Sequence, residues 1–162
     1  YAEKVAIKAE IITKKPDNLG DAQAAAMALT SLTSLWAIED TAQLESGETI
    51  LIQGGAGGCA SFAIQLAKHI GARVITTASA ANHDYLRPLG ADQIIDYNTT
   101  DFAVAVSGCD AVFDTVGGAV AAKRCRRGSP PEARQGGCRP AWPANRSTGL
   151  SVRPRGAAAR GR

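Results

Sequence analysis

The spacing of apolar residues changes period several times along the chain, and each change predicts a new element. A run of Ile and Leu at Thr49–Gln53 predicts a short buried strand. Residues 54–60 are all small and predict a loop, and residues 61–70 keep apolar side chains at helical spacing. Strand, glycine-rich loop and helix, in this order, form the context that a phosphate-binding loop requires.

The flanking stretches predict further elements. Tyr1–Lys8 alternates loosely and Ile11–Thr13 is a second extended piece, so we expect both to be the end of a β-rich region. Asp21 is a favourable N-cap for one or two helices over residues 22–38. Downstream we expect strands at residues 73–77, 92–95 and 110–114, and short helices at residues 82–89 and 101–106.

Strands and helices that alternate in this way predict the α/β class, with a Rossmann-type doubly wound parallel sheet. Ligands of such sheets bind at the carboxyl ends of the strands. We expect the sheet to be incomplete, because the apolar pattern stops at Cys125 and the residues beyond it form an irregular tail. A sheet of four strands would leave the last one as an open edge.

Residues 55–60 fit the dinucleotide fingerprint G-x-G-x-x-(G/A). Gly55 would allow a tight turn that a Cβ would obstruct, and Gly57 would let a pyrophosphate approach bare backbone. Ala60 stands where the helix packs near the strand. The free N–H groups of the first helical turn would then face the phosphates. The alternative is a glycine turn with no ligand.

The residues after the second strand favour NADP(H) over NAD(H). No acidic residue lies between Glu48 and Asp84, although an NAD site usually carries one about 20 residues past the glycines. Ser79, Asn82 and His83 offer a hydroxyl, an amide and an imidazole, which would accept a 2′-phosphate. Two alternatives stay open: Ser79 and Asn82 could cap a helix, and His83 could be a solvated surface residue.

Charge is distributed unevenly along the chain. Residues 1–118 carry 7 Lys/Arg and 14 Asp/Glu, a balance of −7, whereas residues 119–162 carry 11 basic residues and one acid, a balance of +10. A basic tail can bind nucleic acid, but this is the least favoured partner because Trp142 is the tail's sole aromatic residue. An out-of-frame translation of GC-rich DNA explains the tail's Arg, Gly, Ala and Pro more simply.

Cysteine spacing and hydropathy exclude several other classes. The four cysteines form no C-x-x-C pair, so we expect no metal site and interpret Cys59 and Cys109 as reduced, half-buried thiols. There is no signal peptide and no long apolar run, so we expect a cytoplasmic protein without a membrane segment. Tyr1 is the first residue and Met27 the only methionine, so the chain is expected to start inside a longer protein.

Several blocks in a fixed order resemble one family. They are Tyr1–Ile7, Pro16–Asn18, Ala24–Thr30, Ile50–Gly58 and Leu89–Tyr97. Together they resemble the medium-chain dehydrogenase/reductase superfamily, in its zinc-free NADPH:quinone oxidoreductase-like branch, from Tyr1 to about Arg124. Two departures are Cys59 and Ala60, which stand where the family usually has Val and Gly.

The resemblance implies a set of cofactor-binding residues. The pyrophosphate would lie on the loop residues Gly55, Ala56, Gly57, Gly58, Cys59 and Ala60. Ser79, His83 and Tyr97 fall where the branch holds the adenosine 2′-phosphate, and Thr33 falls where a threonine can approach the nicotinamide. Tyr97 could instead be a strand-end aromatic and Thr33 a plain helix residue. No residue suggests itself as a general acid, and none is assigned as catalytic.

The implied function is hydride transfer from NADPH to a small-molecule quinone or enone-type carbonyl substrate. The alternative is a catalytically inactive NADP(H)-binding fragment. Residues 1–41 would be a remnant of a GroES-like catalytic domain with its linking helix, and residues 42–124 a partial dinucleotide-binding domain. Residues 125–162 would be a disordered or frameshifted tail. The family implies homo-oligomers, whereas the state of this chain is left open.

Overall fold

The computed structural model describes residues 2–117 and 139–140. The strands are β1 (Thr49–Gln53), β2 (Arg73–Ala78), β3 (Gln93–Asp96), β4 (Ala111–Asp114) and β5 (Arg139–Pro140). The α-helices are α1 (Asp21–Leu35), α2 (Gly58–Ile70), α3 (His83–Leu86) and α4 (Phe102–Ala105). Shorter pieces are the 3-10 helices η1 (Ala9–Ile11) and η3 (Ala80–Asn82) and the π-helix η2 (Trp36–Thr41).

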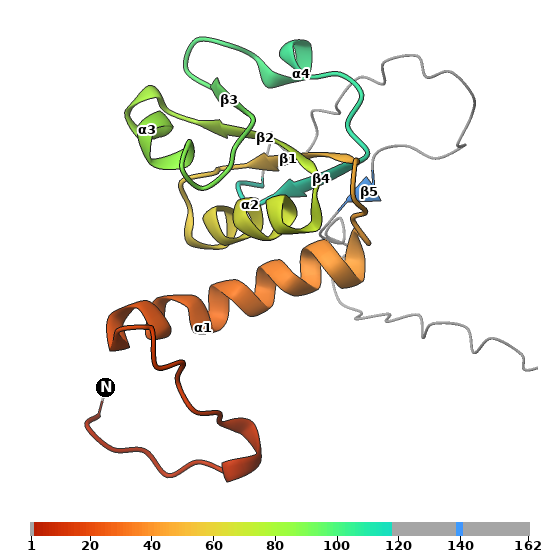
Figure 1. Ribbon diagram of the computed structural model, residues 1–162. Coiled ribbons are helices and arrows are strands. Elements are labelled where there is room, and N and C mark those ends of the chain that lie inside the picture. Colours follow the sequence, from red (N-terminus) through yellow and green to blue (C-terminus); the bar gives the residue numbers. More distant parts are fainter. Residues whose placement is uncertain (1, 118–138, 141–162) are drawn as a thin grey trace, which may run out of the picture.

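The strands form one parallel sheet in the order β3-β2-β1-β4-β5. Helix α2 covers one face and α4 the opposite face, while α1 lies on the outer side of α2 (Figure 1). The chain therefore runs outward from β1 to β3 and then crosses the sheet to β4. This arrangement confirms the α/β class and the doubly wound parallel sheet.

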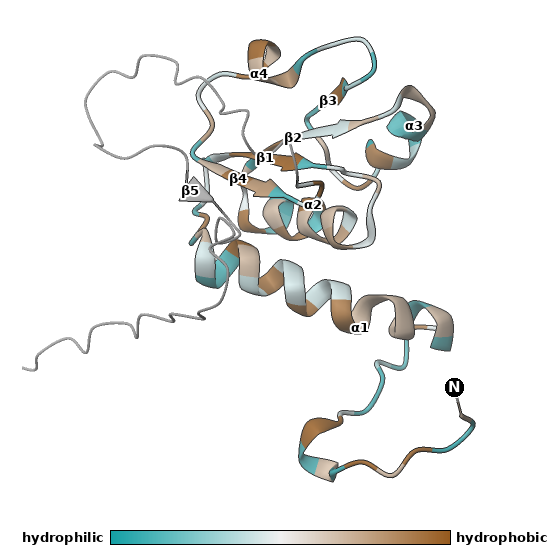
Figure 2. Ribbon diagram, turned by 180° about the vertical axis from the view of Figure 1, so that it is seen from behind, coloured by the Kyte–Doolittle hydropathy of each residue, from teal (hydrophilic) through white to brown (hydrophobic). Residues whose placement is uncertain are grey.

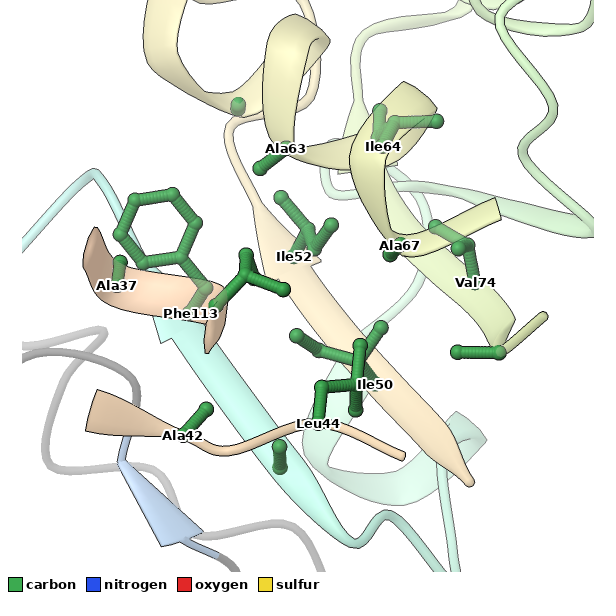
Figure 3. Packing of buried hydrophobic residues seen from close by; sticks show 14 of the residues in the cluster. Ala37, Ala42, Leu44, Ile50, Ile52, Ala63, Ile64, Ala67, Val74 and Phe113 are labelled. Atoms are coloured by element: carbon green, nitrogen blue, oxygen red, sulfur yellow. The ribbon is translucent and has the colours of Figure 1, made fainter. Parts of the chain in front are cut away.

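Apolar side chains fill the space on both faces of the sheet. On the α2 face, Ile50 and Ile52 of β1 pack against Ala63, Ile64 and Ala67 of α2, all completely buried (Figure 3). A smaller cluster fills the α4 face, with these buried members: Leu51, Ile75, Ile95, Phe102, Val106 and Cys109. Because successive strand residues point to opposite faces, the unbroken apolar run of β1 supplies both clusters.

The predicted strand positions agree closely with the structure. β1 spans Thr49–Gln53 as the pattern predicted, and β2 extends one residue further, to Ala78. β3 and β4 each begin one residue later than expected. A fifth strand, Arg139–Pro140, pairs with β4 and was not predicted, so the sheet does not stop after four strands.

Helix boundaries differ more. The N-cap of α1 is Gly20 and not Asp21, and the Gly20 N–H donates to the side chain of Gln23 at 2.9 Å. Residues 82–89 were expected to form one helix, yet α3 ends at Leu86. Pro88 explains the early end, because a proline has no backbone N–H to continue the helical hydrogen bonds.

The expected β structure before α1 is wrong for the described residues 2–20, none of which is in a strand. Ile11 belongs to the 3-10 helix η1, and Ile12 is extended, with its N–H donating to the Ala9 carbonyl at 3.4 Å. An extended segment without a neighbouring strand is not a sheet. Figure 2 shows hydrophobic residues on this segment and on α1, and Val5, Leu29 and Leu32 are 81%, 75% and 67% exposed.

An ion pair links α2 to the start of β3. The Lys68 ammonium lies 3.0 Å from the Asp92 carboxylate, which also accepts a hydrogen bond from the Val74 N–H at 2.7 Å. Burial raises the pKa of the Asp92 carboxyl, but the Val74 N–H, Lys68 and the Arg73 charge together lower that pKa below its ordinary value of 3.8. The carboxylate therefore joins three neighbouring elements, α2, β2 and the turn into β3.

Candidate functional site

The loop between β1 and α2 is bonded to the end of β2. The Gly54 N–H donates to Thr77 Oγ1 at 3.1 Å, and the Gly55 N–H donates to the Thr77 carbonyl at 2.9 Å. Within the loop, the Gly57 N–H donates to the Gly54 carbonyl at 2.8 Å. The loop is therefore a fixed turn at the carboxyl edge of the sheet, where ligands of such folds bind.

Two of the glycines are required by their surroundings. Gly54 has a φ of +71°, and a Cβ there would lie 2.9 Å from Thr115 Oγ1. A Cβ at Gly55 would overlap the hydroxyl of Thr76, which donates to the Ile52 carbonyl at 2.7 Å. The obstruction expected at Gly55 is present, but the positive φ belongs to Gly54, which the fingerprint did not single out.

Helix α2 starts three residues earlier than the sequence indicated. Gly58, Cys59 and Ala60 form its first turn, with Gly57 as the extended N-cap residue. The expected loop over residues 54–60 is thus wrong in its second half. The reason is packing: Ala60 is completely buried in the apolar cluster, so the core-facing stripe of α2 reaches back into the fingerprint.

The first turn of α2 presents free backbone donors. The first N–H groups of a helix have no intrahelical acceptor, and Gly57 has no side chain to cap them. The turn contains no acidic residue, and Ala56, Gly57 and Gly58 are exposed. Since the positive end of the helix dipole lies here, the turn can bind an anion such as a phosphate.

Helix α1 is attached to this turn through residues that the sequence analysis missed. Ser34 is completely buried, and its Oγ lies 2.7 Å from the carbonyls of both Thr30 and Cys59. The methyl of Thr30 lies so close to Gly58 that a Cβ there would be 3.1 Å from it. The i, i+4 spacing of Thr30 and Ser34 was the available signal, because such residues share one helix face.

Thr33, the residue expected near the nicotinamide, lies between Thr30 and Ser34 in the sequence. Its side chain is half-buried, and its Oγ1 donates to the Leu29 carbonyl of the same helix at 3.0 Å. The hydroxyl is thus satisfied locally, in agreement with the interpretation as a plain helix residue. A bond to a cofactor stays a prediction.

An open groove runs between α1 and α2 beside this turn. Its volume is about 280 Å³ and its wall includes Thr30 and Gly58. The remaining lining residues are Gln23, Ala26, Met27, Ser61, Phe62, Gln65 and Tyr85. The groove mixes amides and hydroxyls with apolar side chains, and it begins where the first turn of α2 is exposed.

Ser79 and Tyr97 are the residues that directly follow β2 and β3. The parallel register pairs the last residues of these strands, Ala78 and Asp96. The Ser79 Oγ accepts a hydrogen bond from the Asn82 side chain at 3.1 Å, and Tyr97 is 58% exposed. Ser79 and Asn82 stand at N-cap positions, but neither side chain caps the backbone.

His83 is half-buried and is the first residue of α3. Its Nε2 atom is shielded from solvent and has no hydrogen-bond partner among the described residues. The alternative of a freely solvated surface histidine therefore does not describe it. A nitrogen without a partner in this position leaves capacity for one further bond.

Metal ligands and membrane spans are missing from the described part of the chain. No group of three or more His, Cys, Asp or Glu residues gathers there. Cys59 and Cys109 form no disulfide among the described residues, and the first is half-buried and the second buried. None of the described helices combines the length and hydropathy that crossing a bilayer requires.

Comparisons with known proteins agree with this geometry. Residues 58–127 match the family described as zinc-binding dehydrogenase. A 2-methylene-furan-3-one reductase of Solanum lycopersicum is 41% identical over 118 residues, covering 72% of this chain and 30% of that protein. The NADPH-dependent alkenal/one oxidoreductase, chloroplastic, of Arabidopsis thaliana is 37% identical over 118 residues, with 72% and 30% covered.

A solved structure shares the fold as well. The quinone oxidoreductase from Coxiella burnetii is 46% identical with a TM-score of 0.64, over 67% of this chain and 34% of that one. The chain thus spans about a third of the length of the proteins it matches. The boundaries predicted at residues 41/42 and 124/125 stay predictions, and the second lies outside the described residues.

Proposed function

We propose that this chain belongs to the medium-chain dehydrogenase/reductase superfamily and binds NADP(H) as part of an oxidoreductase. The family match over residues 58–127 and the oxidoreductase relatives support this. The bound cofactor would supply the hydride, and a quinone or enone-type carbonyl compound would accept it. The relatives support this class of reaction, because their names include a quinone oxidoreductase and an NADPH-dependent alkenal/one oxidoreductase.

The observation that carries the proposal is the exposed first turn of α2. Its backbone donors open at the carboxyl edge of the sheet, and no acidic side chain stands in the turn. Ala56 and Gly58 would bind the pyrophosphate through their N–H groups, and Gly57 would let it approach bare backbone. Cys59 would contribute backbone, and Ala60 anchors the helix in the core. Gly55 would fix the loop against β2, which keeps these donors in place.

The 2′-phosphate would lie at Ser79, His83 and Tyr97. Ser79 and Tyr97 follow the paired strand ends Ala78 and Asp96, and His83 Nε2 has no partner among the described residues, so a phosphate oxygen would complete its bonding. A phosphate hydrogen-bonded by such groups gains about 1.5–3 kcal/mol per charge-assisted bond. No carboxylate stands between the end of β2 and Asp84, in the segment where an NAD site usually carries one.

A matched pair of substitutions at Ala56 tests the pyrophosphate site. Ala56 is exposed in the loop, so Asp and Asn of equal size fit equally well. We expect Ala56→Asp to weaken NADPH binding at least tenfold by charge repulsion, and Ala56→Asn to change it little. Isothermal titration measures both, and thermal unfolding without nucleotide checks the fold. Equal affinities for the two variants would contradict a phosphate at this loop.

The competing function is an NADP(H)-binding fragment without turnover. The chain spans about a third of the length of its relatives, and this short span is the observation that supports the alternative. NADPH oxidation at 340 nm over a panel of quinones and enones separates the two functions once binding is measured. Binding with no oxidation on any acceptor would support the inactive fragment. The cytoplasmic location and the absence of zinc remain predictions.

A further inference from the structure

Gln53, the last residue of β1, carries a buried amide that lacks a partner. The side chain is 1% exposed, and its Oε1 is shielded from solvent with no hydrogen bond among the described residues. Buried side-chain oxygens in folded proteins nearly always accept a hydrogen bond. The exception stands directly before Gly54, where the candidate phosphate loop begins.

The sheet register gives the surroundings of Gln53. Two residues earlier, Leu51 lies between Ile75 of β2 and Val112 of β4, in the apolar cluster on the α4 face. Since strand residues alternate between faces, Gln53 points to this same face. A polar row therefore follows the apolar one at the carboxyl edge, with Gln53 paired to Asp114 and, by the same register, next to Thr77.

This row lies at the point where the strand order reverses. The chain leaves β1 through α2 on one face and enters β4 from α4 on the other, so β1 and β4 flank the switch point of the sheet (Figure 1). Ligands of doubly wound sheets occupy the crevice outside the strand ends at that point. Gln53 and Asp114 are the paired residues that end these two strands.

The neighbours of Gln53 have their bonds elsewhere. Asp114 Oδ1 accepts from the N–H groups of Val116 and Gly117 at 2.9 and 3.0 Å. Thr77 Oγ1 accepts from the Gly54 N–H at 3.1 Å. The main-chain carbonyl of Gln53 also accepts from Thr115 Oγ1 at 2.7 Å. The backbone of Gln53 is thus held in place, while its carboxamide oxygen accepts no hydrogen bond from residues 2–117 or 139–140.

We propose that the Gln53 carboxamide accepts a hydrogen bond from an amine or hydroxyl donor of the bound dinucleotide and thereby positions it. This inference rests on the proposed function. The carboxamide turns easily, because the terminal torsion of a glutamine side chain is broad and soft. A small rotation turns Oε1 toward the crevice as the nucleotide enters, so that a donor on the ligand satisfies the oxygen.

The test compares Gln53→Leu with Gln93→Leu. The second variant makes the same chemical change at the opposite, amino-terminal end of an edge strand, β3. Titrations use NADPH, 2′,5′-ADP and nicotinamide mononucleotide on the full chain. We expect Gln53→Leu to bind NADPH roughly tenfold more weakly, which is what loss of one ligand hydrogen bond produces. Gln93→Leu is expected to bind like the unaltered chain.

Stability without nucleotide is the second readout. Replacing an unpaired buried amide by an apolar group of similar size removes an unfavourable group, so the unfolding midpoint of Gln53→Leu should stay or rise. A weaker affinity for 2′,5′-ADP supports a contact to the adenosine half, and a weaker affinity for the mononucleotide supports one to the nicotinamide half. Gln53→Met, unbranched and of similar volume, repeats the test if the leucine variant does not fold.

Two results overturn the inference. Unchanged affinity for all three nucleotides, in a folded variant at Gln53, would make the residue purely structural while the proposed function stands. If the unaltered chain binds none of them, the proposed function and the role of Gln53 fail together.

Discussion

At the scale of single residues, the glycine fingerprint predicts only part of the steric constraints on the loop between β1 and α2. The sequence indicated that Gly55 cannot carry a Cβ, and Thr76 is the reason. It did not indicate that Gly54 is the residue with the positive φ. Both constraints depend on strands far away in the sequence, so the spacing of glycines reports that a loop exists and not which neighbours shape it.

The hydrogen bond from Ser34 of α1 to Cys59 of α2 is visible only in the structure. The Ser34 hydroxyl has one proton for two carbonyls, and this proton joins α1 to the first turn of α2. We expect Ser34→Ala to lower the free energy of unfolding by about 1 kcal/mol, the usual contribution of one buried hydrogen bond. Urea denaturation measures the change.

Ser31→Ala is the matched control for this prediction. Ser31 lies on the same helix and is half-buried, so it reports the gain in helix propensity that alanine brings. Equal unfolding free energies for the two variants would show that the Ser34 hydroxyl does not hold the helices together.

At the scale of elements, the strands were easier to predict than the helix ends. The run Thr49–Gln53 is apolar on both faces and bounded by turns, so its limits are visible in the sequence. The start of α2 at Gly58 was not visible in the sequence, because small residues suit both a loop and a first helical turn. The π-helix after α1 and the short strand β5 have no periodic signature at all.

The Asp92 carboxylate makes the junction of α2, β2 and β3 sensitive to acid. Its pKa is lowered in the folded chain, so the unfolded chain binds the proton more readily. The stabilisation is therefore complete above pH 3.8, the ordinary pKa, and is lost as the pH falls through the lower folded value. We expect Asp92→Asn to flatten the dependence of the unfolding free energy on pH in that acidic window.

Asp84→Asn is the matched control, because Asp84 is fully exposed and pairs only loosely with Arg87 at 3.8 Å. It should leave the pH dependence as it is. An identical pH profile for Asp92→Asn and the unaltered chain would contradict the role of the Asp92 carboxylate.

At the scale of the whole molecule, α1 exposes an unusually apolar outer side. Leu29 and Leu32 are 75% and 67% exposed and lie three residues apart, on one face of the helix. We expect the double substitution Leu29→Gln, Leu32→Gln to reduce self-association, because exposed apolar patches promote it. Light scattering over a concentration series measures this.

The binding of NADPH is the control for that prediction, since neither leucine belongs to the proposed site. Unchanged light scattering with an intact fold would contradict the assignment of this face as the source of association. The sequence predicted one or two helices over residues 22–38 but not which side packs on α2, because that depends on tertiary contacts such as the bond of Ser34 to Cys59.

The fold class and most of the loop could be predicted because they depend on local patterns. The register could not, since it is set by pairing between distant strands: it pairs Gln53 with Asp114, and Ala78 with Asp96. The residues of the proposed 2′-phosphate site were therefore visible in the sequence, whereas the pairing of the strands that precede them was not. The tail from Cys125 lies outside the described residues, apart from Arg139–Pro140.

The binding of NADPH and NADH to the purified full chain is compared by isothermal titration under identical salt. We predict that both bind and that NADPH binds more than tenfold more tightly, because hydrogen bonds to a charged phosphate contribute about 1.5–3 kcal/mol each. Equal affinities would contradict the 2′-phosphate site, and no binding of either nucleotide would contradict the function of the loop itself.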